Sequence, residues 1–181
     1  LVKSAASPDV PIILVSEGLN ILDNHSQHDH GHHHQGDPHL WLSVPNAISY
    51  VEKITTALVK LAPEDEQYFS VRSQAYREEL AQLDSFMQEQ LAQIPIESRV
   101  IITYHNAFSY LAERYGFAVV EFLVTNPEAE PNARDLARLA QVLSEQEKPV
   151  VFAEPQLSSG TRYVQALAKE VGAQIYTLHS D

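Results

Sequence analysis

Hydrophobic and polar residues follow different patterns in the two halves of the chain. Near the amino terminus, the apolar run at 10–15 predicts a short buried strand. Apolar residues then recur at helical spacing from about Ser43 to Leu61, which predicts an amphipathic helix. Pro63 ends this helix, and no helix-breaking residue follows before about Gln93. At 1.5 Å per residue the second helix would be about 46 Å long, which suits either a helical bundle or a rigid rod between two lobes.

The second half alternates short apolar runs with amphipathic segments. Four strands are predicted, at 100–104, 117–123, 149–153 and 174–178. Three helices are predicted between them, at 107–115, 133–147 and 159–171. This alternation predicts an α/β fold with a mainly parallel sheet. Ligands of such sheets bind beyond the carboxyl ends of the strands, so the residues that follow the strands are candidates for a site.

Polar residues that can bind metals or transfer protons follow three of the predicted strands. His105 comes directly after the first strand, Glu154 after the third, and His179 and Asp181 after the last. We therefore expect all four residues at one edge of the sheet. Taken singly, His105, His179 and Asp181 are each more typical of an ordinary polar residue at a strand end than of a ligand. Glu154 suits either a carboxylate that orients a ligand histidine or a carboxylate that caps a helix.

Another candidate ligand, His39, lies on the turn Asp37-Pro38-His39 just before the first long helix. Imidazole and carboxylate groups without a thiolate form a ligand set that suits zinc, and also manganese or iron. The chain contains no cysteine, which excludes disulfides and cysteine-type zinc sites. It also contains no His-Glu-x-x-His helix and no phosphate-binding glycine loop, which weakens a prediction of zinc protease or nucleotide chemistry.

Histidine is the most unusual feature of the composition, with nine residues in a chain of 181. The segment 24–36 is of low complexity, and we expect a mobile loop there. Its interruption by Asp29, Gly31 and Gln35 argues against an expression tag. A loop that collects zinc weakly at several places is favoured over a plain solvated loop, because neutral imidazole binds zinc even in an unstructured chain. The histidines of this accessory loop are His25, His28, His30, His32, His33 and His34.

Charge and hydropathy exclude some classes of partner. The chain has 24 acidic and 12 basic residues, and its formal net charge is −12 with histidine neutral. This balance argues against binding to nucleic acid and is compatible with attracting cations. No apolar stretch approaches the roughly 18 residues that a membrane-spanning helix needs, so no direct membrane span is predicted.

Several of these features are more informative as an ordered set than singly. In order along the chain they are the His-rich segment, Asp37-Pro38-His39-Leu40-Trp41-Leu42, the uninterrupted helix, Tyr104-His105-Asn106-Ala107-Phe108, Thr125-Asn126-Pro127-Glu128, Phe152-Ala153-Glu154-Pro155-Gln156 and Leu178-His179-Ser180-Asp181. This set resembles the zinc- and manganese-binding solute-binding proteins of bacterial ABC importers, especially the ZnuA-like zinc members. The resemblance extends over nearly the whole chain.

The resemblance implies a two-lobed solute-binding-protein fold with a long linking helix and a carboxyl-terminal α/β lobe built on a parallel sheet. The expected parts are the end of the amino-terminal lobe at 1–24, the His-rich mobile loop at 25–36, the ligand turn and helix at 37–62, the linking helix at 63–94 and the carboxyl-terminal lobe at 95–181. The chain is expected to lack most of the amino-terminal lobe and the carboxyl-terminal end of the family fold.

For the site, the resemblance implies one metal ion at the lobe interface, bound by a histidine from each of three motifs and by a carboxylate or water. His39 matches the second histidine motif and His105 the third. The fourth ligand is expected to be Asp181 or His179. The family's first histidine has no counterpart in this chain.

The function implied is that of a zinc-binding protein, not an enzyme, which captures Zn²⁺ outside the cytoplasmic membrane and delivers it to an ABC permease. It would be periplasmic or lipid-anchored, with the His-rich loop as an accessory. A manganese- or iron-binding member of the same family is one alternative. A zinc-dependent hydrolase, with Glu154 or Asp181 as general base, is another. A metal-dependent surface or adhesion protein on the same scaffold is the third.

Overall fold

The computed structural model describes residues 10–23 and 36–180, and these residues form two compact units. The helical unit comprises the chain up to Asn20 together with Ser43–Met87. The sheet unit comprises Ile21–Leu42 together with Gln88–Asp181. The domain boundaries predicted from the sequence stay predictions.

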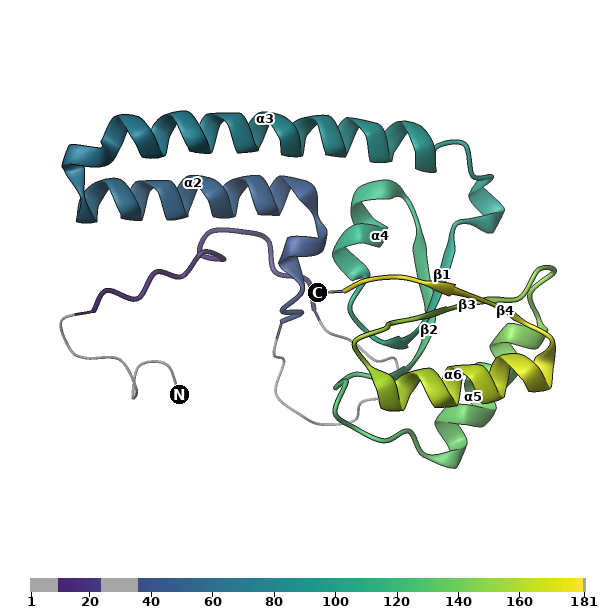
Figure 1. Cartoon of the computed structure of the whole chain (residues 1–181). Helices are drawn as coiled ribbons and strands as arrows, with labels where there is room; N and C mark the ends of the chain where they lie inside the picture. The colour runs from purple at the N-terminus through teal and green to yellow at the C-terminus, as the bar shows by residue number, and fades with distance from the viewer. Residues whose placement is uncertain (1–9, 24–35, 181) are drawn as a thin grey trace. The chain divides into compact units, whose positions relative to one another are not determined.

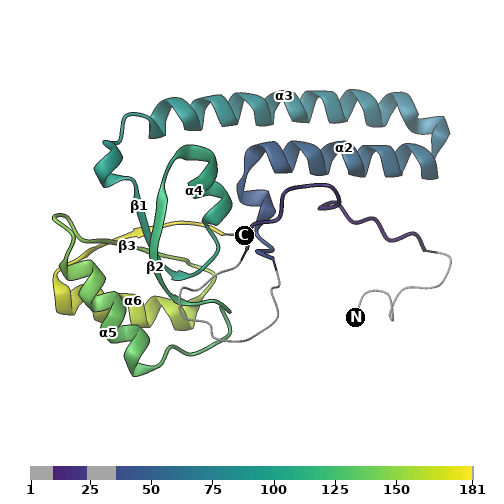
Figure 2. The same cartoon turned by 180° about the vertical axis from the view of Figure 1, so that it is seen from behind.

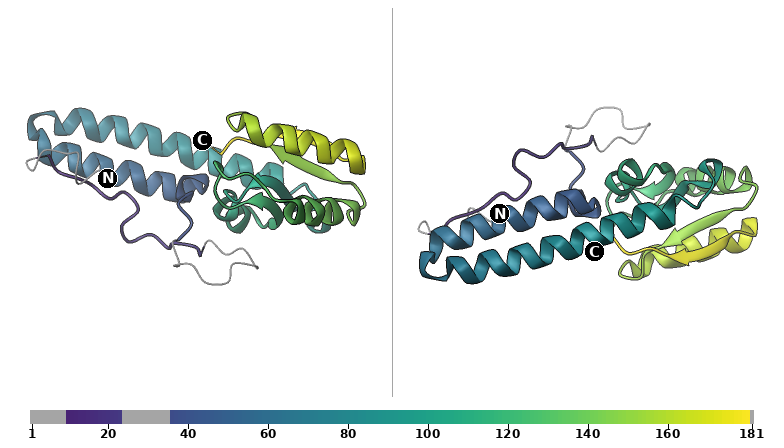
Figure 3. Two further views of the ribbon diagram at one scale, coloured as in Figure 1. Left: turned by 90° about the horizontal axis from the view of Figure 1, so that it is seen from below. Right: turned by 90° about the horizontal axis from the view of Figure 1, so that it is seen from above.

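Two antiparallel helices dominate the helical unit. Helix α2 covers Val44–Leu61 and begins directly after Ser43, with a proline in its first turn. The short 3-10 helix η2, Pro63–Asp65, reverses the chain into helix α3, Glu66–Leu91. The two long helices lie side by side in every view (Figures 1 and 3). An ion pair of 2.7 Å between Arg77 and Glu52 links them.

The strand predicted at 10–15 is wrong. Residues 11–14 have no regular secondary structure, and the Leu14 side chain is 59% exposed. An apolar run becomes a strand only when another strand pairs with it, and no such partner exists among the described residues. The segment is instead attached to α2 through Lys53, whose ammonium group donates to the carbonyl oxygens of Val15, at 3.0 Å, and Glu17.

A four-stranded parallel sheet forms the centre of the sheet unit (Figures 1 and 2). Its strands are β1 Val100–His105, β2 Ala118–Val124, β3 Val150–Ala153 and β4 Gln174–Thr177, in the order β2-β1-β3-β4. The connecting helices are α4 Ser109–Tyr115, α5 Ala133–Ser144 and α6 Ser158–Val171. All three strand pairs are parallel. The predicted α/β fold with a parallel sheet and a long helix is confirmed, and the predicted strands agree with the observed ones to within one or two residues.

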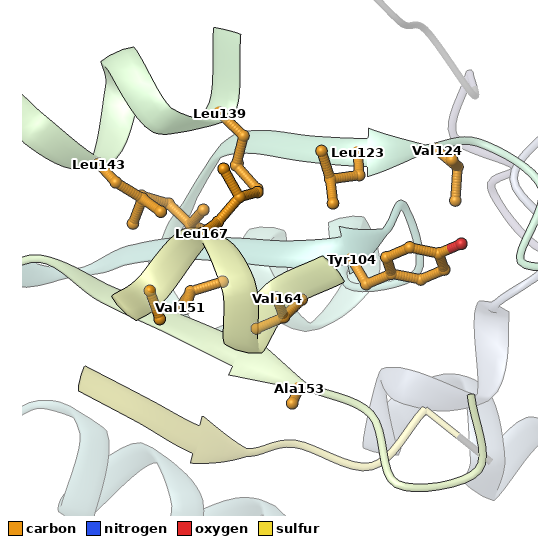
Figure 4. Close-up of a cluster of buried hydrophobic side chains, with 11 residues drawn as sticks. Tyr104, Leu123, Val124, Leu139, Leu143, Val151, Ala153, Val164 and Leu167 are labelled. Carbon is orange, nitrogen blue, oxygen red and sulfur yellow. The ribbon is translucent and has the colours of Figure 1, made fainter. Parts of the chain in front are cut away.

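Helices cover both faces of this sheet. On one face, α5 packs on β2 and α6 packs on β1 and β3, and the two helices contribute fully buried side chains that include Leu139, Leu143 and Val164 (Figure 4). On the other face, the segment leading into α4 buries Ala107 and Phe108 completely. Alternate residues of β1 serve the two cores, as the period of a strand requires.

A glycine makes the first of these cores possible. A Cβ atom at Gly160, in the first turn of α6, would lie 2.5 Å from the nearest atom of the Tyr104 ring. The ring therefore occupies the space that any larger residue would fill. Its hydroxyl donates to the carbonyl oxygen of Ala129 at 2.9 Å, which satisfies the polar end of this buried side chain.

The strand order places a topological switch point between β1 and β3. From β1 the chain crosses to β2 on one side, and it then returns to β3 on the other side of β1. Connections that diverge in this way leave a crevice at the carboxyl ends of the two strands, where ligands of such sheets bind. His105 is the last residue of β1, and Glu154 directly follows β3. Both candidate residues therefore lie at the switch point.

None of the helices in the described residues combines the length and the apolar character that crossing a membrane requires.

Candidate metal site

Two histidine side chains of the sheet unit face each other although they are 66 residues apart in sequence. The Nε2 atoms of His39 and His105 are 3.4 Å apart, and the ring planes are inclined by 69°. His105 is only 3% exposed, so its ring is almost entirely removed from solvent. The His39 ring also lies beside the indole ring of Trp41, and the two ring centroids are 5.5 Å apart.

The backbone around His39 fixes the direction of its ring. Asp37 is completely buried, and its Oδ1 accepts a hydrogen bond of 2.9 Å from the His39 backbone N–H. The same oxygen lies 2.7 Å from His39 Nδ1. Pro38 restricts the backbone between the two residues, so the carboxylate and the ring form a short, rigid turn. The 3-10 helix η1, Leu40–Leu42, follows directly.

A second buried carboxylate holds His105. Glu154 Oε2 lies 2.7 Å from His105 Nδ1, and Oε1 accepts the His105 backbone N–H at 3.3 Å. Ser180 donates its hydroxyl proton to Oε2 at 2.7 Å and accepts a hydrogen bond from Gln156. Glu154 is 1% exposed, so these contacts replace the water that the carboxylate would otherwise bind.

Each imidazole therefore has the same arrangement, with Nδ1 beside a carboxylate and Nε2 directed at the other ring. For His39 the Nδ1 contact is a hydrogen bond, whereas the 2.7 Å contact of His105 Nδ1 with Glu154 does not have hydrogen-bond geometry. A proton carried on Nδ1 of both rings leaves the lone pair of each ring on Nε2. Two lone pairs that face each other at 3.4 Å repel unless a cation lies between them. Two nitrogens bound to one tetrahedral zinc ion at about 2.05 Å are themselves about 3.3 Å apart. The spacing therefore fits two ligands of a single metal ion.

The carboxylates also favour a cation at this place. Asp37 and Glu154 are both buried, and Asp37 Oδ2 has no hydrogen-bond partner among the described residues. A buried carboxylate that is only partly satisfied is stabilised by a nearby positive charge. Carboxylates that accept the second N–H of ligand histidines raise the basicity of these ligands and fix their orientation.

The other predicted site residues lie elsewhere or outside the described residues. His179 follows β4 and its side chain is exposed. Asp181 and the six histidines of the accessory loop lie outside the described residues. Within residues 10–23 and 36–180, no group of three or more His, Asp or Glu side chains has an arrangement that could hold a metal ion. The described part of the site thus provides two ligands, His39 and His105.

Sequence reasoning missed two residues that hold the two histidines, Asp37 and Ser180. In the sequence Asp37 is part of a turn, and its position two residues before a histidine is the one signal that indicates its role. Ser180 contacts Glu154 and, through its backbone oxygen, accepts a hydrogen bond of 2.9 Å from the Trp41 indole. These contacts join residues that are 26 and 139 positions apart, and no local pattern predicts them.

Comparison with known proteins identifies the family of this chain. The family model described as zinc-uptake complex component A, periplasmic, matches residues 1–180. The chain belongs to this family. The resemblance inferred from the ordered motifs is thereby confirmed.

Relatives in the family differ in the metal that their names give. The chain is 34% identical to the iron-binding protein YfeA of Yersinia pestis, over 92% of this chain and 52% of YfeA. It is 35% identical to the zinc-binding lipoprotein AdcA of Streptococcus pneumoniae, over 93% of this chain and 33% of AdcA. The chain therefore spans about half or less of the length of these relatives.

The fold of the chain is similar to that of a solved metal-bound structure. A Zn(II)-bound variant of AdcAII from Streptococcus pneumoniae superposes with a TM-score of 0.82 at 23% identity, over 98% of this chain and 66% of AdcAII. This likeness supports the α/β fold of the chain.

Proposed function

We propose that this chain is the metal-binding part of an extracytoplasmic protein that captures Zn²⁺ and delivers it to an ABC-type permease, without enzymatic activity. The observation that carries the proposal is the pair of Nε2 atoms 3.4 Å apart, each on a ring whose Nδ1 lies beside a buried carboxylate. Family membership and the names of the relatives, which include a periplasmic component and a lipoprotein, support a place outside the cytoplasmic membrane.

Zinc is proposed as the cargo because of the chemistry of the ligands. Family membership does not choose the metal, since one relative is named for iron and another for zinc. Two neutral imidazoles suit zinc better than manganese, which prefers oxygen ligands. The separation of the two nitrogens also fits the short bonds of tetrahedral zinc. A manganese- or iron-binding protein of the same family is the alternative that the experiment below distinguishes.

We further propose Asp181 as the carboxylate that serves as the family's fourth ligand, with His179 as the alternative. Ser180, which directly precedes Asp181, is 1% exposed and bonded to the carboxylate that holds His105. The chain is therefore anchored beside the site just before Asp181. The exposure of the His179 side chain argues for the carboxylate. The histidines between positions 25 and 34 are proposed as weak accessory ligands that raise the zinc concentration near the site.

Calorimetric titration with zinc, with manganese as competitor, tests the proposal. Three proteins are compared: the wild-type chain, a His39→Ala/His105→Ala variant, and a variant with glutamine at the six loop histidines. We expect one tight zinc site in the wild type, its loss in the double variant, and its persistence with fewer weak sites in the glutamine variant. A tight site that survives in the double variant would overturn the proposal.

Two further results would contradict parts of the proposal. Tighter binding of manganese than of zinc would assign the chain to the manganese alternative. Turnover of ester or phosphate substrates by the zinc-loaded chain, abolished by the same double substitution, would support a hydrolase and contradict a purely transporting role.

A further inference from the structure

A single tyrosine hydroxyl connects the two segments that carry the histidines. Tyr110 lies in α4 and is 2% exposed. Its hydroxyl donates to the backbone carbonyl oxygen of Asp37 at 3.0 Å and accepts the backbone N–H of Leu22 at 2.9 Å. The contacts join residues that are 73 and 88 positions apart.

The first of these contacts leads to His39. Asp37 provides both the carbonyl oxygen that Tyr110 binds and the carboxylate oxygen that holds the His39 ring at 2.7 Å. A shift of the Asp37 backbone would therefore move His39 with it, because Pro38 leaves little freedom between the two residues.

Tyr110 is in turn fixed to the segment that carries His105. Helix α4 begins four residues after His105, and the intervening Ala107 and Phe108 are completely buried. A well-packed segment of this kind does not deform without loss of its packing. The Tyr110 hydroxyl thus holds the His39 segment against the His105 segment.

The second contact reaches the other side of the His-rich segment. Leu22 and Asp37, on the two sides of the His-rich segment, are paired through their backbones. The Asp37 N–H donates to the Leu22 carbonyl oxygen at 2.7 Å, and we call this pair and its neighbours the stem. An antiparallel bridge between Asp23 and Gly36 continues this pairing. The Tyr110 hydroxyl bonds to both strands of the stem, so the stem and the histidine pair share one anchor.

We propose that Tyr110 is a positioning residue for zinc, which sets the separation of the His39 and His105 nitrogens and couples this separation to the stem of the His-rich segment. The inference rests on the proposed function, because it assumes that zinc binds between the two rings. It adds a residue that acts on His39 through Asp37, whose carbonyl oxygen it binds and whose carboxylate holds the ring.

The test compares Tyr110→Phe with Tyr104→Phe in the full chain. Each substitution removes one buried hydroxyl that donates to a backbone carbonyl, and both tyrosines lie in the sheet unit. Only Tyr110 is bonded to Asp37. Zinc affinity is measured by competition with a chromophoric chelator, and the thermal stability of each metal-free protein is measured alongside.

We expect Tyr110→Phe to weaken zinc binding by about 10-fold or more, in the range found for groups that orient metal ligands. Tyr104→Phe should also lower thermal stability, by less because its hydroxyl donates one hydrogen bond and accepts none from Leu22, but it should leave zinc affinity within about twofold, since its partner is Ala129 and not Asp37. Equal loss of affinity in the two variants would mean a general loss of stability and would overturn the inference. Wild-type affinity in Tyr110→Phe would overturn it as well.

A second readout tests the coupling to the stem. Zinc binding should slow hydrogen exchange of the Leu22 amide in the wild type, because ligand and stem stabilise the same anchor. This protection should be absent in Tyr110→Phe, and equal protection in both proteins would contradict the coupling. If the wild type itself lacks a tight zinc site, the proposed function fails first, and this result is distinct from failure of the Tyr110 inference.

Discussion

The helical unit and the sheet unit bury their apolar residues to very different extents. Helix α3 has one buried residue, Ser73, and exposes large side chains along its length, among them Tyr68, Val71 and Phe86. An open apolar groove of about 350 Å³ lies between α2 and α3 and is lined by residues such as Ile54 and Phe69. In the sheet unit, by contrast, the side chains between the sheet and its helices are almost fully buried (Figure 4).

This difference shows that local sequence features stabilise the helical unit, whereas tertiary packing also stabilises the sheet unit. The helices of the helical unit follow from local features: the spacing of apolar residues, a proline in the first turn of α2 and at the start of η2, and hydrogen bonds between near neighbours. The sheet unit adds a closed core, which gives a rigid frame for buried polar groups. Both proposed histidine ligands and both carboxylates belong to the sheet unit. The site therefore lies where packing is tight enough to hold two rings at a set distance.

The largest difference between the two units is expected when a leucine of each unit is replaced by alanine. Leu139→Ala, at a completely buried position of the sheet unit, should lower the free energy of unfolding by about 2–5 kcal/mol. Leu58→Ala, at a position 39% exposed in α2, serves as the matched variant and should cost less than about 1 kcal/mol. Urea unfolding is followed by far-ultraviolet circular dichroism, which reports the helices of both units, and by the fluorescence of Trp41, the single tryptophan, which reports the sheet unit. Equal losses in the two variants would refute the contrast.

Removal of one carboxylate charge should affect the site without destroying its frame. Glu154→Gln keeps the shape of the side chain but loses the charge beside His105, and we expect zinc affinity to fall by about 10–100-fold. Glu121→Gln is the matched control, because Glu121 is also in the sheet unit but is paired with Arg138 at 2.7 Å. Zinc affinity in the control should stay within about twofold. An unchanged affinity in Glu154→Gln would show that the Glu154 charge does not support the ligand.

The smallest effect is expected for the ion pair between the two helices. The Glu52 and Arg77 side chains are 52% and 37% exposed, so a double-mutant cycle with Glu52→Gln and Arg77→Gln should give a coupling energy of about 0.2–1 kcal/mol. Raising the salt concentration should reduce this value further. A coupling above about 2 kcal/mol would show that the helical unit has a strong polar link, contrary to the comparison.

The sequence predicted the elements well because their causes are local. The strand at 100–104 and the helix that Gly116 ends are each specified by a few neighbouring residues, and the structure has them as β1 and α4. The prediction of a strand at 10–15 is wrong, because a strand forms only by pairing with another strand, and that partner is set by residues far along the chain.

For the site, the sequence indicated the two histidines but not what holds them. The position of His105 at a strand end and of His39 on a turn could be read directly, and the structure brings their nitrogens together. The roles of Ser180 and Tyr110 depend on contacts between distant segments, which only the folded structure reveals. The assignment of Asp181, rather than His179, as a further metal ligand stays a prediction.

The central claim is that His39 and His105 bind one zinc ion together. X-ray absorption at the zinc edge tests it most directly, on a chain that carries glutamine at the six loop histidines and one equivalent of zinc. The account predicts imidazole nitrogens at about 2.0–2.1 Å from zinc, and a fall of two in their number after His39→Ala/His105→Ala. An imidazole shell that is unchanged by the double substitution would contradict the account.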